Sequence, residues 1–267
     1  MKMKILKTYD NFIFEDLKTL DDIENDRNIE NKQWDISEPG IKIWFDITPY
    51  DDPSQTPYGK LLILANTMRD LRTRYKDDEW DNTLIASTHV GFIFSDGRIL
   101  HATSEFKSKE INGVQYEDVN GEHVKDINEN PRFYVMFNLG GDEKDVEKYG
   151  NKVIEYIVKQ GTFGKSYDWS GINRIFPDLE PVLNSTNGDE FNQGMDDNDD
   201  DEKDTFYCSQ FVAYIMIKLG LTTLEELRNL RRVNGDLDPN QNDYDVNPTD
   251  LYELVSKKGK KLKLKNK

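Results

Sequence analysis

Cysteine, histidine and long apolar runs are all scarce in this chain of 267 residues. Its single cysteine, Cys208, cannot form a disulfide within the chain, which favours a reducing compartment. The N-terminal segment lacks the apolar run of a signal peptide, and no stretch approaches the roughly 20 apolar residues that span a bilayer. We therefore expect a soluble cytoplasmic or intracellular protein. Its many Asn, Asp and Lys residues are typical of an A+T-rich genome, such as a viral or phage genome.

Basic charge is also in short supply. The chain has 35 Lys and Arg against 51 Asp and Glu, which gives a net charge of −16. Such a surface repels phosphate backbones, so we expect no nucleic-acid partner. The lysine-rich tail at 257–267 leaves open a weak contact with an anionic membrane surface. A solvated edge strand or a frayed tail explains these lysines more simply.

The composition provides enough apolar residues, 36% of the chain, for one sizeable core. We expect an N-terminal extension at 1–40, one domain at 41–256 and the lysine-rich tail. Residues 185–205 contain the pair Asn187-Gly188 and the mostly acidic run 196–203, and predict an exposed insert within the domain. The sequence does not indicate an oligomeric state.

Strand and helix patterns alternate irregularly along the domain. Runs of β-branched and aromatic residues predict strands at 41–47, 84–94, 98–104 and 133–138. Helical spacing predicts helices at 60–75, 144–160, 206–220 and 222–229. The order indicates an α+β fold.

Cys208 lies on the apolar face of the predicted 206–220 helix, which a glycine ends. A cap at Asp204 or Thr205 would place it in the first turn, where free backbone N–H groups and the helix dipole favour a thiolate. The alternative is a small buried apolar residue. A base close to Cys208 would favour the interpretation of this residue as a nucleophile.

The chain has three histidines. His89 is the candidate general base. It precedes Val90-Gly91, where the glycine would let another backbone or a ligand come close. A two-residue hairpin loop would place His101 on the opposite face of the sheet from His89. A three-residue loop with Gly97 in a left-handed conformation would make His101 a diagonal neighbour, about 7–8 Å away by backbone, able to orient His89. We expect His123 to be an ordinary half-buried histidine in the loop at 120–126.

No metal is expected, because neither Cys-x-x-Cys nor His-Glu-x-x-His spacing occurs. Nor does the chemistry of a thiol nucleophile require an organic cofactor.

Four segments carry a resemblance to a known family. They are residues 87–91 (STHVG), 164–169 (GKSYDW), 206–212 (FYCSQFV) and 247–251 (NPTDL). In this order they resemble the circularly permuted papain-like hydrolases of the NlpC-type superfamily. That group includes the YiiX/YaeF-like amidases and, more distantly, the lecithin:retinol acyltransferases. The resemblance covers about residues 40–255. It implies an antiparallel sheet carrying the histidines, packed against a helix carrying the cysteine.

By position, the resemblance implies that Cys208 is the nucleophile, His89 the base and His101 the polar third residue. A histidine at the third position is similar to the acyltransferase branch. Gln210 stands where the family usually has an acidic residue. The residues that would support the site or bind substrate are Tyr167, Asp168, Tyr207, Ser209 and Gln210.

The predicted activity is therefore that of a thiol hydrolase or acyltransferase. It would cleave an amide, ester or thioester in a peptide, amide or acyl-lipid substrate through an acyl-cysteine intermediate. The alternative is a catalytically silent binding protein of the same fold, which would act through the acidic insert or the basic tail.

Overall fold

The computed structural model describes residues 31–48, 52–53, 55, 59–60, 63, 87–104, 112–161, 206–234 and 246–267. The acidic insert, Tyr167, Asp168 and both predicted caps, Asp204 and Thr205, lie outside the described residues. So does most of the helix predicted at 60–75.

The core is a six-stranded sheet in the order β5-β4-β3-β2-β6-β7, with every pair antiparallel. Its strands are β2 (Lys42–Asp46), β3 (His89–Ile93), β4 (Ile99–Ser104), β5 (Asn112–Glu117), β6 (Tyr134–Asn138) and β7 (Lys260–Lys261). Near the edge, β1 (Lys32–Trp34) and β8 (Leu264–Asn266) form a separate antiparallel pair. The α+β class is confirmed.

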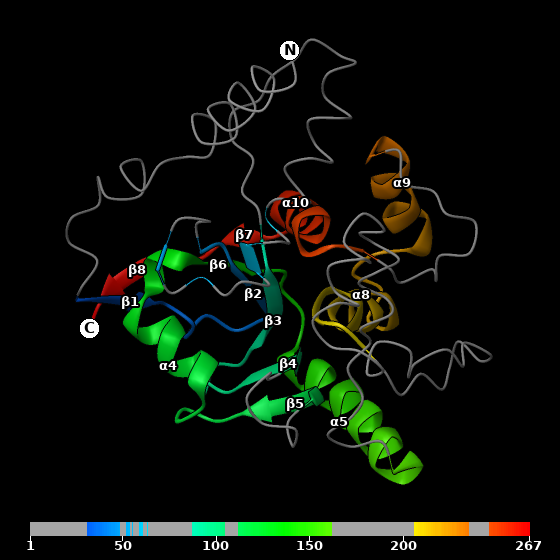
Figure 1. Ribbon diagram of the computed structural model, residues 1–267, viewed down its shortest axis with the longest axis horizontal. Coiled ribbons are helices and arrows are strands. Elements are labelled where there is room, and N and C mark those ends of the chain that lie inside the picture. The colour runs from blue at the N-terminus through cyan, green and yellow to red at the C-terminus, as the bar shows by residue number, and fades with distance from the viewer. Residues whose placement is uncertain are drawn as a thin grey trace, which may run out of the picture.

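Helices cover both faces of this sheet (Figure 1). The described helices are α4 (Glu122–Glu129), the 3₁₀ helix η1 (Pro131–Phe133), α5 (Glu143–Gln160), α8 (Cys208–Lys218), α9 (Leu224–Asn234) and α10 (Pro248–Lys258). Side chains of α5, α8 and α10 pack with one face of the sheet. Residues of α4, η1 and β1 pack with the other. The sheet is thus a middle layer.

Strand β2 shows how the sequence produces these layers. Ile43 and Phe45 belong to the core on the α8 side, whereas Trp44 belongs to the core on the α4 side. Successive side chains of a strand point to opposite faces. A strand buried on both faces therefore reads as a continuous apolar run.

The β3–β4 hairpin has the three-residue loop. Phe92 pairs with Leu100 and Ile93 with Ile99. The N–H of Gly97 donates to the carbonyl of Phe94 over 3.0 Å, and Gly97 has a φ of 87°. Continued along the strands, this register places His89 opposite Thr103. Of the two alternatives, the one that brings His89 and His101 to the same face is observed.

Several element boundaries differ from the predictions. Helix α8 begins at Cys208 with Tyr207 as its N-cap, so the cap is neither Asp204 nor Thr205. Gly220 follows the helix in a left-handed conformation, as expected for a terminating glycine. His123 lies in α4, not in a loop. The lysine-rich tail forms β7 and β8, which agrees with the edge-strand interpretation.

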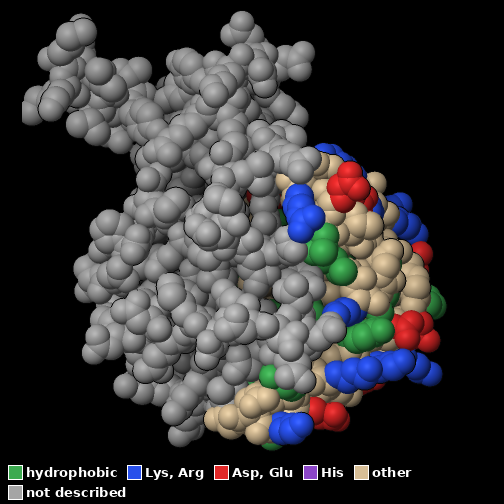
Figure 2. Space-filling view, turned by 90° about the vertical axis from the view of Figure 1, so that its right-hand side faces the viewer, with side chains coloured by type: hydrophobic (Ala, Val, Ile, Leu, Met, Phe, Trp, Pro, Cys, Tyr) green, Lys and Arg blue, Asp and Glu red, His purple; other side chains and the backbone are tan. Residues whose placement is uncertain are grey.

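None of the described helices combines the length and apolar character needed to cross a membrane. Figure 2 looks at the side where α5 and α9 lie, and there basic and acidic side chains are interspersed over the described surface. No histidine is visible on the described part of that face.

Candidate functional site

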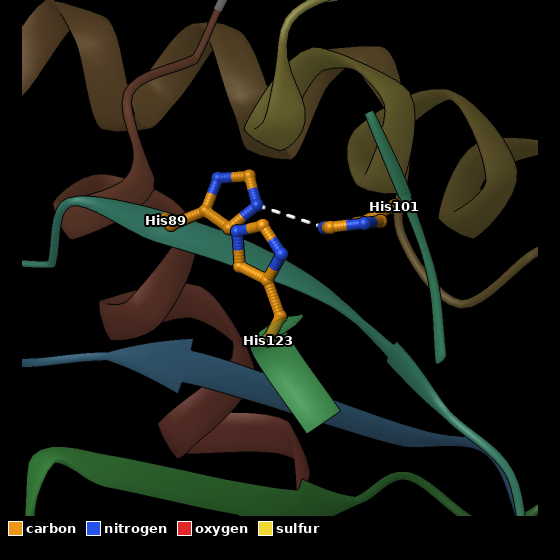
Figure 3. Close-up of side chains that lie close together, drawn as sticks. All are labelled: His89, His101 and His123. Atoms are coloured by element: carbon orange, nitrogen blue, oxygen red, sulfur yellow. Dashed lines mark hydrogen bonds between the residues drawn. The ribbon is translucent and has the colours of Figure 1, made fainter. Parts of the chain in front are cut away.

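The three histidines meet on the α4 side of the sheet (Figure 3). Nε2 of His89 on β3 lies 2.9 Å from Nδ1 of His101 on β4. The ring of His123, from α4, has its centroid 4.7 Å from that of His101 and 5.3 Å from that of His89. The predicted His89–His101 contact is thus present, and a third ring joins it.

Gly91 makes this close approach possible. A Cβ at this position would lie 2.8 Å from Cβ of His101 and 3.0 Å from Cζ2 of Trp44. Only glycine leaves that space without displacing its neighbours. A close approach at Gly91 was expected from another backbone or a ligand; the groups that approach it are the side chains of His101 and Trp44 and the carbonyl of Leu100.

Glu117 on β5 anchors two of the rings through one oxygen. Its Oε1 lies 3.1 Å from Nε2 of His101 and 2.7 Å from Nδ1 of His123. Burial opposes ionisation of this carboxyl, but the hydrogen bonds from both histidines hold its pKa well below the usual range. Glu117 is therefore ionised and only accepts.

The ionised carboxylate fixes the tautomers along the chain of rings. Burial lowers the pKa of His101 to about 4, and burial together with the neighbouring histidines lowers the pKa of His89 well below 6.5. Both rings are thus neutral near pH 7. Nε2–H of His101 donates to Glu117, so its Nδ1 accepts from Nε2–H of His89. This leaves Nδ1 of His89 as the basic nitrogen.

His123 has a different electrostatic environment. Burial lowers its pKa, but the hydrogen bond to Glu117 and the charges of Glu117 and Asp46 outweigh this effect and raise the pKa above 6.5. Its side chain retains 27% of its accessible surface. His123 is therefore the ring of the cluster that protonates most readily.

Cys208 lies against β3 from the other side. It belongs to the same core as Val90, the neighbour of His89, whereas the ring of His89 packs against Trp44 in the opposite core, with centroids 5.2 Å apart. Burial raises the pKa of the Cys208 thiol to about 11, and backbone hydrogen bonds at Ser209 and Val90 lower it only in part. The position at the start of the helix does not by itself produce a thiolate.

Among the described residues, the structure shows no hydrogen bond between the sulfur of Cys208 and a ring nitrogen of His89. Cys208, at the start of α8, and the ring of His89, at the start of β3, lie on opposite faces of the sheet. The predicted His89–His101 pair is thus in contact, and Cys208 is near but not joined to it.

Three of the four resembling segments meet around Cys208. Oγ of Ser209 donates to the carbonyl of Val246 over 2.6 Å. Oγ1 of Thr249 accepts from the N–H of Ser87 over 3.1 Å. The segments at 87–91, 206–212 and 247–251 are therefore linked in space, although more than 100 residues separate the first two. The segment at 164–169 lies outside the described residues.

The predicted supporting residues that are described fix the start of α8. The side-chain oxygen of Gln210 accepts from the N–H of Tyr207 over 3.4 Å. The hydroxyl of Tyr207 accepts from the N–H of Val246 over 2.9 Å. Tyr207, Ser209 and Gln210 are all buried, which gives them a supporting role in the fold.

His123, Glu117 and Trp44 are the site residues that sequence reasoning missed. Each lies on a different element, and only pairing of β4 with β5 brings Glu117 to His101. The available signal was the i, i+3 pair Val124 and Ile127, which both turn to the core and mark α4 as an amphipathic helix.

The fold and the site define an α+β protein with a buried cysteine at a helix start on one face of the sheet and a histidine–carboxylate network on the other. No protein-family model, no curated protein and no solved structure matches the chain.

Proposed function

We propose that the protein is a cysteine-nucleophile hydrolase or acyltransferase of permuted papain-like design. It would cleave an amide, ester or thioester bond. The observation that carries the proposal is the hydrogen-bonded chain from His89 through His101 to Glu117, which leaves Nδ1 of His89 as the basic nitrogen. The next residue on the strand, Val90, forms a backbone hydrogen bond with Cys208. The linked segments at 87–91, 206–212 and 247–251 support the same design.

Because the two side chains lie on opposite faces of the sheet, the proposed reaction requires Nδ1 of His89 to reach the thiol around the start of β3 when substrate binds. This nitrogen then takes the proton of Cys208 while the sulfur attacks the substrate carbonyl carbon. The resulting oxyanion would be stabilised by backbone N–H groups at the start of α8. Collapse of this intermediate breaks the bond to the leaving group, which receives the proton from His89. Water, or a second acceptor, then attacks the acyl-cysteine with His89 again as the base, and the thiol is restored.

The raised pKa of the Cys208 thiol and the lowered pKa of His89 both disfavour a preformed thiolate–imidazolium pair. A preformed ion pair would need a thiol pKa below neutrality, whereas burial raises the pKa of Cys208 to about 11. The proton must then move during attack. Catalytic hydrogen bonds are often long in enzymes without substrate and shorten when substrate binds.

Alkylation of Cys208 tests this proposal. Because the chain has one cysteine, every thiol label reports on this residue. With iodoacetamide near neutral pH, we expect His89→Ala to react about 100-fold more slowly than the original protein. The residual reaction of the variant should increase only at alkaline pH. Circular dichroism verifies that the variant is folded, and Cys208→Ala gives the background.

An unchanged rate and pH profile in His89→Ala would contradict the proposal. It would favour the alternative of a catalytically silent binding protein. If His89 does act as the base, a panel of peptide, peptidoglycan-type amide and acyl-lipid substrates identifies the substrate class. Detection of a covalent acyl-Cys208 adduct by intact-protein mass spectrometry distinguishes turnover from binding.

A further inference from the structure

The three histidines present nitrogens at a spacing that suits a metal ion. One ring nitrogen from each of His89, His101 and His123 lies within 4.8 Å of the other two. In a tetrahedral zinc site with Zn–N bonds of about 2.0–2.1 Å, ligand nitrogens are about 3.4 Å apart. Ring movements of about 1 Å would therefore complete the geometry.

Glu117 occupies the position of a carboxylate behind metal-binding histidines. Histidines that bind metals usually donate their second ring N–H to a carboxylate, which fixes the tautomer and turns the other nitrogen toward the ion. Oε1 of Glu117 receives such bonds from Nε2 of His101 and Nδ1 of His123. In the neutral rings, Nδ1 of His101 and Nε2 of His123 then carry lone pairs.

Trp44 provides a separate indication that the cluster takes a ligand. Its ring packs against all three histidines, with centroid distances of 5.2, 5.9 and 6.4 Å. Its indole N–H is buried and has no acceptor in the part of the chain that the structure describes. Buried donors without an acceptor are costly and rare. A hydroxide or anion bound to an ion at the cluster would supply the missing acceptor.

Part of the cluster reaches the surface. His89 and His123 are both partly exposed, whereas His101 is fully buried behind them. Three imidazoles with a fourth position left for water or another ligand are typical of zinc sites, and imidazole also suits copper and nickel.

We propose that His89, His101 and His123 form a binding site for a divalent transition-metal ion of the zinc class. On binding, the proton on Nε2 of His89 passes through solvent to Nδ1 of the same ring, and the ion takes its former place between Nε2 of His89 and Nδ1 of His101. The ion thereby breaks the hydrogen bond that orients His89. Metal binding and the proposed base function of His89 exclude each other.

Titration of the metal-stripped full chain with Zn²⁺ by calorimetry tests the site. We expect saturable binding of one ion. The affinity for Zn²⁺ should fall about 100-fold or more in His123→Ala and about 10- to 100-fold in Glu117→Gln. Cys208→Ala is the matched control and should bind as tightly as the original protein. Substitution by Co²⁺ should give the visible absorption of a four- or five-coordinate ion without a thiolate charge-transfer band.

Three outcomes would overturn the metal site: the absence of saturable binding, binding that survives His123→Ala, and binding that disappears in Cys208→Ala. None of them bears on the hydrolase proposal, since the alkylation test is done without metal. As a second readout, Zn²⁺ should slow alkylation of Cys208 in the original protein but not in His123→Ala. Equal slowing in both would also count against the site.

Discussion

At the scale of single residues, Cys208 is a potential nucleophile in a buried position. Its thiol is 4% exposed, and burial raises its pKa from 9.0 to about 11. The sequence identified the residue because it is the sole cysteine and starts an apolar helix. It could not reveal the pKa, because desolvation depends on the strands that pack over the thiol.

The raised pKa predicts a loss of stability at alkaline pH. The unfolded thiol ionises near pH 9.0 and the folded thiol near 11. The stabilisation is therefore complete below pH 9 and is lost as the pH rises toward 11, by about 2–3 kcal/mol in all. Urea unfolding at pH 8 and at higher pH should show a steeper decline for the original protein than for Cys208→Ser. Parallel declines would mean that the thiol is not desolvated.

His89 and His101 were also identified from the sequence, whereas His123 and Glu117 were not. The first two lie on one hairpin, where local spacing and turn type limit the geometry. The other two reach the site only through the pairing of β4 with β5 and the packing of α4. Local patterns contain no information on contacts of that kind.

At the scale of elements, the loop between β3 and β4 decides whether the site exists. The sequence allowed two loop lengths, and the choice depended on the conformation of Gly97. Its φ of 87° lies in the left-handed region, which residues with a Cβ adopt at a cost. One residue fewer in the loop would turn His101 to the α8 side.

Substitution of Gly97 should therefore cost stability through backbone strain alone. A Cβ at this position would meet only Cγ1 of Val119 at 3.5 Å, so no clash contributes. We expect Gly97→Ala to lower the free energy of unfolding by about 1 kcal/mol. Gly97→Asn should cost less, because asparagine tolerates the left-handed region better. Urea denaturation compares the two, and equal losses would contradict the explanation.

Helix α4 shows why a short element escapes prediction. Within Glu122–Glu129 only Val124 and Ile127 are buried. In the sequence, two apolar residues that follow the pair Asn120-Gly121 are too few to indicate a helix, and the segment was predicted to be a turn and a loop. The long helix α5 was predicted because Val146, Val153 and Ile157 repeat the pattern over several turns.

At the scale of the whole molecule, the two ends of the described chain lie side by side. β1 pairs with β8, and Lys260 and Lys265 form ion pairs with Glu38 and Asp35. Partners more than 200 residues apart cannot be read from periodicity. The tail lysines thus contact acidic residues of the protein itself, and the proposed membrane contact remains a prediction.

The tail should accordingly contribute to stability through Leu262. This side chain is 5% exposed and belongs to the core on the α4 side. We expect Leu262→Ala to lower the free energy of unfolding by about 2–3 kcal/mol. Lys263→Ala, at an exposed neighbouring position, is the control and should be nearly neutral. Thermal unfolding monitored by circular dichroism measures both, and a neutral Leu262→Ala would mean that the tail is not part of the core.

The carboxylate of Glu117 sets the direction in which the hydrogen bonds of the histidine network run. The rings of His101 and His123 both donate to Oε1, while Oε2 accepts from the backbone N–H of His123 over 3.1 Å. In Glu117→Gln that backbone donor would keep the amide oxygen on its side and turn the NH₂ group toward the rings. His101 would then accept at Nε2 and donate from Nδ1, and the proton on His89 would move to Nδ1. One atom on β5, remote from the thiol, thus sets which end of the network can take up a proton.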